Sequence, residues 1–223
     1  MAERAGFLAC SRCSPGRGAE TVAESCARVV IDYIESHLSQ RVTLSMLSRR
    51  TGLSPNYVHE AFSRIVGITP KRYHETRRID AFKALIQKGE SIASSLYSTG
   101  FGSSRALYES ARKVMGMTPA AFQRGGDLRI RFAIVKRGKG LVLVAGTRAG
   151  PCAVLTGGSR TRLLRELRRE FPRADLTLES PPPARWTTAV RSSSREDPFV
   201  STFPGAIRDR IYRARVLSAQ RPR

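Results

Sequence analysis

The chain has 223 residues, 41% of them hydrophobic, so it can hold one large domain or two small ones. Its 39 Lys and Arg residues against 18 Asp and Glu residues give a formal net charge of +21, which favours a polyanionic partner because neutralised phosphates release counterions. No apolar run of roughly 18 residues or more occurs, which excludes a membrane-spanning segment, and the N-terminus lacks the apolar stretch of a signal peptide.

The chain has four cysteines, three of which lie within its first 26 residues. Residues 1–20 are rich in Gly and Ser and carry Cys10 and Cys13. In a chain without a secretion signal, cysteines favour free thiols or metal ligands over disulfides. Cys26 falls inside a predicted helix, so we interpret it as a core thiol.

From residue 21 to residue 126 the pattern is helical. An amphipathic helix opens this region, and a second helix, LSMLSRR over residues 44–50, ends near Gly52, where a left-handed residue lets the chain turn. Ser54 and Pro55 then start another helix, as its cap and its first residue. Helix, glycine-containing turn and helix is the layout of a helix–turn–helix unit.

A long helix over about residues 71–88 joins this unit to a second one of similar sequence. The second unit contains a turn at residues 99–101, followed by SSRALYESARKVMG. Each copy closes with Gly-x-Thr-Pro, at residues 67–70 and 116–119, 49 positions apart. With its flanking turns, the joining helix could set the two second helices about one DNA turn, roughly 34 Å, apart.

The second helix of each unit is the expected DNA reader, because such a helix lies in the major groove with its N-terminal side chains on base edges. Asn can pair with adenine, Arg with guanine, and Glu can accept from the cytosine amino group, although Glu could equally weaken binding near phosphates. The predicted readers are Asn56, His59, Glu60, Ser104, Arg105 and Glu109. The predicted phosphate contacts, which position the protein without reading sequence, are Arg64, Lys71, Arg72, Arg77, Arg112 and Lys113.

From Arg129 the period changes to short β-rich runs separated by glycine-containing turns. RFAIVKRG, GLVLVAG and PCAVLTGG are three predicted strands, and one amphipathic helix follows over residues 159–171. Residues 127–180 therefore predict a small α/β unit that is marginal by itself. Runs of Pro and Ser predict a disordered or non-homologous tail over residues 181–223, with a weak helix near residues 207–217.

The duplicated unit, the long helix and the Gly-x-Thr-Pro closures resemble the DNA-binding domain of the AraC family over about residues 25–126. With the flanking FLACSRC, IRFAIVKRGKGLVLVAGTRAGPCAVLTGG and LLRELRREFPRAD, the chain resembles the Ada family of adaptive-response regulators that repair alkylated DNA. The resemblance implies an α+β multi-domain protein: an all-α double helix–turn–helix domain over residues 21–126, then a ribonuclease-H-like α/β subdomain. It also implies double-stranded DNA and RNA polymerase as partners and a bacterial cytoplasmic, nucleoid-associated location.

The chain departs from the Ada pattern at both of that family's methyl-accepting sites. Residues 1–20 look like a remnant of the family's four-cysteine zinc domain, in which Cys10 and Cys13 match the second pair of ligands and the first pair would lie upstream of Met1. Because structural zinc takes four ligands, we expect no cofactor unless the missing ligands are supplied. The family's Pro-Cys-His-Arg acceptor motif is absent from the sequence, and Cys152 matches a non-catalytic strand.

We therefore expect a sequence-specific DNA-binding transcriptional regulator of the AraC family, Ada-like, with no small-molecule substrate. We also expect its gene to be truncated or frameshifted, because both acceptor cysteines are missing. The alternative function is that of a methylated-DNA–protein-cysteine methyltransferase acting in DNA alkylation repair.

Overall fold

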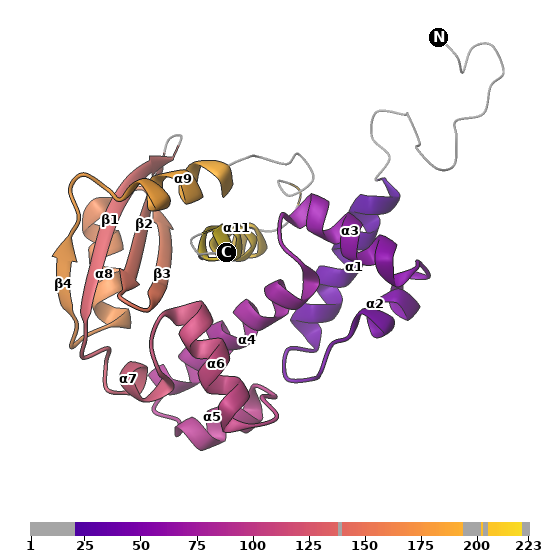
Figure 1. Ribbon diagram of the computed structural model, residues 1–223, viewed down its shortest axis with the longest axis horizontal. Helices are drawn as coiled ribbons and strands as arrows, with labels where there is room; N and C mark the ends of the chain where they lie inside the picture. Colours follow the sequence, from indigo (N-terminus) through magenta and orange to yellow (C-terminus); the bar gives the residue numbers. More distant parts are fainter. Residues whose placement is uncertain (1–20, 138–139, 194–201, 203–204, 220–223) are drawn as a thin grey trace, which may run out of the picture.

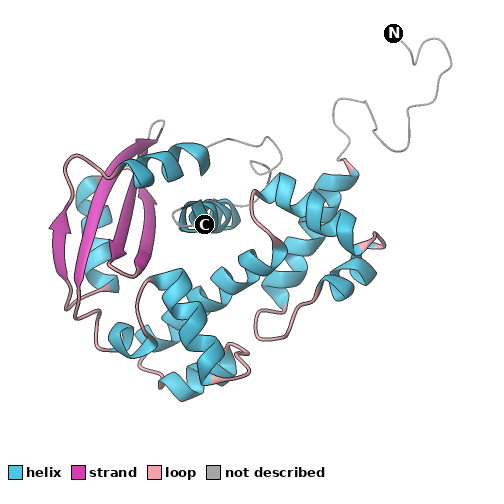
Figure 2. Cartoon of the chain, in the orientation of Figure 1, coloured by secondary structure: helices cyan, strands magenta, loops and turns pink. Residues whose placement is uncertain are grey.

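A computed structural model describes residues 21–137, 140–193, 202 and 205–219. Helices make up most of this part of the chain, and the strands form one sheet at one end (Figure 2). None of the described helices is long and apolar enough to cross a lipid bilayer. The elements, in chain order, are α1 (Val22–Ser36), α2 (Leu44–Thr51), α3 (Pro55–Val66), α4 (Pro70–Gln87), α5 (Ile92–Ser98), α6 (Ser104–Met115), α7 (Pro119–Gln123), β1 (Arg129–Arg137), β2 (Gly140–Thr147), β3 (Gly150–Gly157), α8 (Arg160–Glu170), β4 (Asp175–Leu178), α9 (Ala184–Ser193) and α11 (Gly205–Ala219).

Local sequence accounts for the ends of the helices in both helix–turn–helix units. A Ser or Thr side chain caps the first turn by accepting a backbone N–H, which satisfies a donor that has no partner inside the helix. Gly52 and Gly100, which follow α2 and α5, both have a φ of 70°. The caps are Thr43 for α2, Ser54 for α3, Ser91 for α5 and Ser103 for α6.

The two Gly-x-Thr-Pro closures, residues 67–70 and 116–119, fold alike. Each glycine ends its helix in the left-handed conformation, with a φ of 77° or 59°, and each following apolar residue is buried. Each threonine side chain accepts a backbone N–H at 3.2 Å, and each proline is the first residue of the next helix. The repeated tetrapeptide therefore ends one helix and starts another in both copies.

The helical region contains two cores that α4 connects. Figure 1 shows α4 running from the α1–α3 group to the α5–α6 group. The first core lies among α1, α2 and α3 and includes Phe62 and Tyr73, both fully buried. The second core begins at Ile79 and Phe82 of α4 and continues through α6 into the sheet. A division of the chain at residue 126 therefore separates two stretches of sequence that share one core.

The sheet confirms the three predicted strands and adds a fourth. Its strand order is β3-β2-β1-β4, with β1–β2 and β2–β3 antiparallel and β1–β4 parallel. The predicted helix is present as α8, which lies behind the sheet in Figure 1. The sequence does not predict β4, because this strand has only four residues at the sheet edge and most of them are exposed, so it carries no apolar alternation.

The prediction of a disordered tail over residues 181–223 is wrong for α9 and α11. Trp186 and Val190 of α9 are 2% and 1% exposed, and Ile211 of α11 is fully buried. The weak helix expected near residues 207–217 is confirmed by α11. Arginine and serine residues interrupt the apolar residues of both helices, and tertiary packing rather than local propensity stabilises such segments.

The helix α11 packs against both cores. It lies between the sheet and the first helix–turn–helix unit (Figure 1). Its Ile211 and Ala214 belong to the first core, and its Tyr212, Val216 and Leu217 belong to the second. A segment that resembled a tail thus joins the two halves of the molecule.

Candidate nucleic-acid interface

The predicted readers of the first unit lie on the outer face of α3. Val58 and Phe62 are fully buried and fix the inner face of this helix. Asn56, His59 and Glu60 are exposed on the opposite side. A shallow surface hollow of about 410 Å³ follows this face, and it is lined by Tyr57, His59, Glu60, Ala61, Ser63 and Arg64.

The predicted readers of the second unit lie on the outer face of α6, where two of them bind each other. Ser104, Arg105 and Glu109 are exposed, whereas Leu107 and Ala111 are fully buried. Arg105 Nε donates a hydrogen bond to Glu109 Oε1 at 2.9 Å, and the two side chains are 88% and 55% exposed. This hydrogen bond holds the pKa of the Glu109 carboxyl below its usual value. Their spacing of four along a helix is the sequence signal that could have predicted this pair.

Four of the six predicted phosphate contacts are exposed. Arg64 lies in the last turn of α3, and Lys71 lies in the first turn of α4. Arg112 and Lys113 lie in the last turn of α6. All four are therefore available to a polyanion beside the two reading helices.

The prediction of Arg77 as a phosphate contact is wrong. Its side chain is 8% exposed and donates to Glu35 Oε1 at 2.7 Å and to Asp80 Oδ2 at 3.0 Å. Arg77 follows the fully buried Tyr73 by four residues, so it lies on the inner stripe of α4. That helical period was the signal that could have excluded it.

Arg72, also predicted as a phosphate contact, is largely buried and is bound within the protein. Its side chain is 12% exposed, and its Nη1 lies 3.5 Å from a Glu75 oxygen. Its Nε donates a hydrogen bond to Ser218 Oγ of α11 at 3.1 Å. The sequence offered no sign of this contact, because 146 positions separate the two residues.

The two cysteines in the described part of the chain are buried thiols. Cys26 and Cys152 are 3% and 1% exposed. Burial raises the pKa of both, that of Cys152 to about 12, so neither is a thiolate at neutral pH. The interpretation of Cys26 as a core thiol is confirmed, whereas Cys10 and Cys13 lie outside the described residues. No three His, Cys, Asp or Glu side chains among residues with described positions gather closely enough to hold a metal ion.

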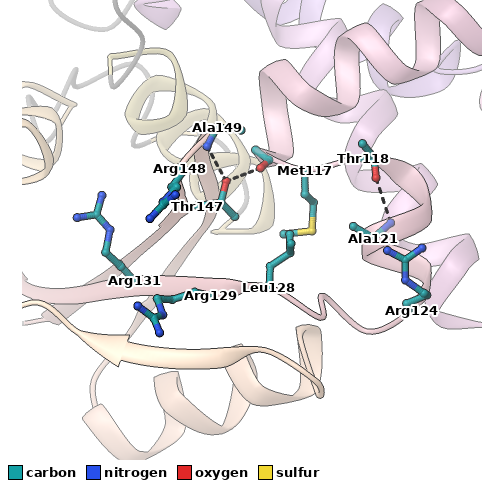
Figure 3. Close-up of a pocket in the computed structure, with 11 residues that line it drawn as sticks. Met117, Thr118, Ala121, Arg124, Leu128, Arg129, Arg131, Thr147, Arg148 and Ala149 are labelled. Carbon is teal, nitrogen blue, oxygen red and sulfur yellow. Dashed lines mark hydrogen bonds between the residues drawn. The ribbon is translucent and has the colours of Figure 1, made fainter.

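A pocket that sequence analysis missed lies between the end of the second unit and the sheet. Figure 3 shows Met117 and Leu128 extending toward one another, with Arg131 and Arg148 on the sheet side. The pocket has a volume of about 960 Å³ and is lined by Gly116, Met117, Thr118, Ala121, Arg124, Leu128, Arg129, Arg131, Thr147, Arg148 and Ala149. Carboxylates neutralise three of its arginines, in the ion pairs Arg124–Asp127, Arg129–Asp175 and Arg131–Glu179.

Comparison with known proteins agrees with the geometry of the two units. A family profile described as a helix-turn-helix domain matches residues 47–125. The "Bifunctional transcriptional activator/DNA repair enzyme Ada" of Escherichia coli (strain K12) is 32% identical over 225 residues, which cover 97% of this chain and 61% of that protein. The "Regulatory protein ada" of Salmonella typhimurium is 34% identical over 177 residues, which cover 76% of this chain and 48% of that protein. No solved structure matches the chain.

These matches extend well beyond the helix–turn–helix region. The chain spans about half to three-fifths of the length of these two relatives. The match that covers 97% of the chain reaches into residues 181–223, so the expectation of a non-homologous tail is corrected together with that of a disordered one. The chain therefore carries an AraC-type helix–turn–helix domain and is homologous, over most of its length, to Ada regulators and DNA-repair proteins.

Proposed function

We propose that this chain acts as a sequence-specific DNA-binding transcriptional regulator of the Ada type. The observation that carries the proposal is the pair of helices α3 and α6. Each buries one face in a core, exposes polar side chains on the other, and ends in the same Gly-x-Thr-Pro closure. Such a helix can enter the major groove while its partner helix crosses the backbone.

In this proposal α3 and α6 read successive major grooves of double-stranded DNA. The 18 residues of α4 support a separation of the two readers by about one DNA turn. Arg64, Lys71, Arg112 and Lys113 contact phosphates, which sets affinity and register without reading bases. The name of the Escherichia coli relative includes a transcriptional activator, which supports an activator role for this chain. Contact with RNA polymerase and a bacterial cytoplasmic, nucleoid-associated location are part of the proposal and rest on the resemblance to the Ada family.

We also propose the following domains for the chain. Residues 21–126 form the DNA-binding domain, residues 127–180 correspond to the N-terminal subdomain of an alkyltransferase, and residues 1–20, with Cys10 and Cys13, resemble part of a zinc-binding domain. A ribonuclease-H-like subdomain is supported by the antiparallel β1-β2-β3 meander followed by α8 and a β4 parallel to β1.

Selection from random double-stranded DNA at physiological salt tests this function. We expect enrichment of one sequence containing two short elements whose centres lie about one helical turn apart. Arg64→Gln should weaken binding to every sequence and reduce the salt dependence of affinity by about one phosphate contact. Equal binding to all sequences would reduce the chain to a general polyanion binder.

The name of the Escherichia coli relative also includes DNA repair. Methyl transfer to a cysteine, which the resemblance to the Ada family implies, is therefore a second candidate function. Incubation with DNA that carries labelled methylphosphotriester or O6-methylguanine tests it. We expect no label on Cys26 or Cys152, because both are buried thiols with a raised pKa. Stoichiometric label on a cysteine of this chain would assign the repair activity instead.

A further inference from the structure

Each of the two reading helices carries a column of three polar residues at equivalent positions on its outer face. A shift of 49 positions places Asn56, Glu60 and Arg64 of α3 over Arg105, Glu109 and Lys113 of α6. Within each helix the three residues are four apart, so they lie above one another on one face. Each column consists of a predicted reader near the helix N-terminus, an acid in the middle and a base near the C-terminus.

The acid of the second column binds the reader. Glu109 Oε1 accepts from Arg105 Nε at 2.9 Å, both side chains are largely exposed, and the charge of Lys113 also favours the ionised carboxylate. In the first column the reader is Asn56, which has no charge to pair with Glu60. The two columns therefore share their positions and differ in the chemistry of the reader.

We propose that Glu109 is a positioning residue that holds Arg105 for bidentate recognition of a guanine by the second reading helix. This inference rests on the proposed function of the chain. It assigns a G·C base pair to the DNA element read by α6, and it makes Glu109 act through Arg105 rather than on a base of its own.

The geometry of the guanidinium supports this assignment. Arg presents five N–H donors in a rigid planar fork. When Nε–H is bonded to a carboxylate, the two Nη groups at the far edge remain available for the O6 and N7 acceptors of guanine in the major groove. An arginine side chain that is 88% exposed otherwise distributes over many rotamers, and the bond to Glu109 reduces the conformational entropy it loses on binding.

The charge of Glu109 produces a second, opposite effect. A carboxylate on a reading face repels the nearby phosphates, so its removal should increase affinity for DNA of unrelated sequence. Its removal should also reduce the preference for guanine, because Arg105 is no longer oriented. A residue that only stabilised the helix would lower both quantities together, and a Glu that read cytosine would change the preference at a different base pair.

Binding of wild-type protein and variants to a complete set of single-base changes in the selected DNA tests the inference. Arg105→Ala should reduce the preference for guanine over the other bases at one base pair by about 5- to 150-fold. Glu109→Ala should reduce the preference for guanine at that same base pair by roughly threefold or more. Glu109→Gln should reduce it less, because its amide oxygen can still accept from Arg105 Nε. The effects of Arg105→Ala and Glu109→Ala should not add in the double variant.

Glu166→Ala is the matched control, since it removes an acid of α8 that accepts from Arg162 Nε, four residues earlier, at the same 2.9 Å and outside the two reading helices. It should leave discrimination at every base pair within about twofold, and circular dichroism should show α-helix content unchanged in all variants. Unchanged guanine preference in Glu109→Ala, additive effects, or a loss at another base pair would overturn the inference. A wild-type protein without any sequence preference would instead overturn the proposed function.

Discussion

At the scale of single residues, the two turn glycines have the same backbone conformation in different surroundings. Gly52 and Gly100 both have a φ of 70°. A Cβ added at Gly52 would meet nothing within 4 Å, whereas one added at Gly100 would lie 1.6 Å from the carbonyl oxygen of Ser39. The first glycine is required by conformation alone, and the second also permits close approach of the loop that follows α1.

Alanine at these two positions should therefore have unequal effects. Gly52→Ala should lower the free energy of unfolding by about 1–2 kcal/mol, the cost of a left-handed residue with a side chain. Gly100→Ala should cost clearly more, because the backbone near Ser39 must move to accommodate the new Cβ. Urea denaturation of both variants measures the difference, and equal losses would show that the contact with Ser39 is absent in solution.

Sequence patterns predicted the exposure of single residues well where the helical period applies. Asn56, His59 and Arg105 all lie on outer faces, as predicted from the apolar positions between them. The prediction for Arg77 is wrong because its position on the inner stripe of α4, rather than its residue type, decides its partners. An arginine on the inner stripe of α4 finds its partners inside the protein, such as Glu35, and those partners are distant in sequence.

At the scale of elements, α11 contributes to the first reading helix. Arg215 of α11 donates hydrogen bonds to the carbonyl oxygens of Ile65, at 2.9 Å, and Val66. These carbonyls are at the C-terminal end of α3, where the last carbonyl oxygens have no N–H donors within the helix. Arg210 adds an ion pair with Glu35 of α1 at 2.7 Å. The α11 helix thus caps α3 and connects it with α1.

Because α11 packs on the first core, substitution of its buried residues should lower the stability of the protein without touching any predicted DNA contact. Ile211→Ala removes a fully buried side chain from the first core and should cost about 2–5 kcal/mol. Ala219→Ser, at the exposed last residue of the same helix, should change stability by less than about 0.5 kcal/mol. Thermal unfolding compares the two variants, and the same melting temperature for both would mean that α11 does not pack on the first unit.

At the scale of the whole molecule, the second helix–turn–helix unit and the sheet form one packed body. Lys83 of α4 donates to the carbonyl oxygen of Cys152 in β3 at 2.9 Å and to Glu170 of α8 at 2.7 Å. The side chain of Thr147 donates to the carbonyl oxygen of Gly116, which ends α6. These contacts cross the boundary at which the sequence changes from helical to β periodicity.

The shared core predicts that the second unit and the sheet unfold together. Trp186 is the single tryptophan of the chain, and it is buried with the sheet at 2% exposure. Its fluorescence should therefore change at the same denaturant concentration as the helical signal at 222 nm, which arises mostly from the helix–turn–helix units. A fluorescence transition that is separate from the helical one would show that the two parts are independent domains.

The amino-acid sequence by itself determined the duplicated reader. Its caps, its left-handed glycines and its 3.6-residue period act between neighbours along the chain, so they specify α2, α3, α5 and α6 locally. Tertiary structure decided what depends on residues far apart: the docking of α11 on both cores, the burial of Arg77 against Glu35, and the continuous core from α4 into the sheet. These features arise when apolar and charged groups from distant segments are removed from water together, and no local pattern encodes which segments will meet.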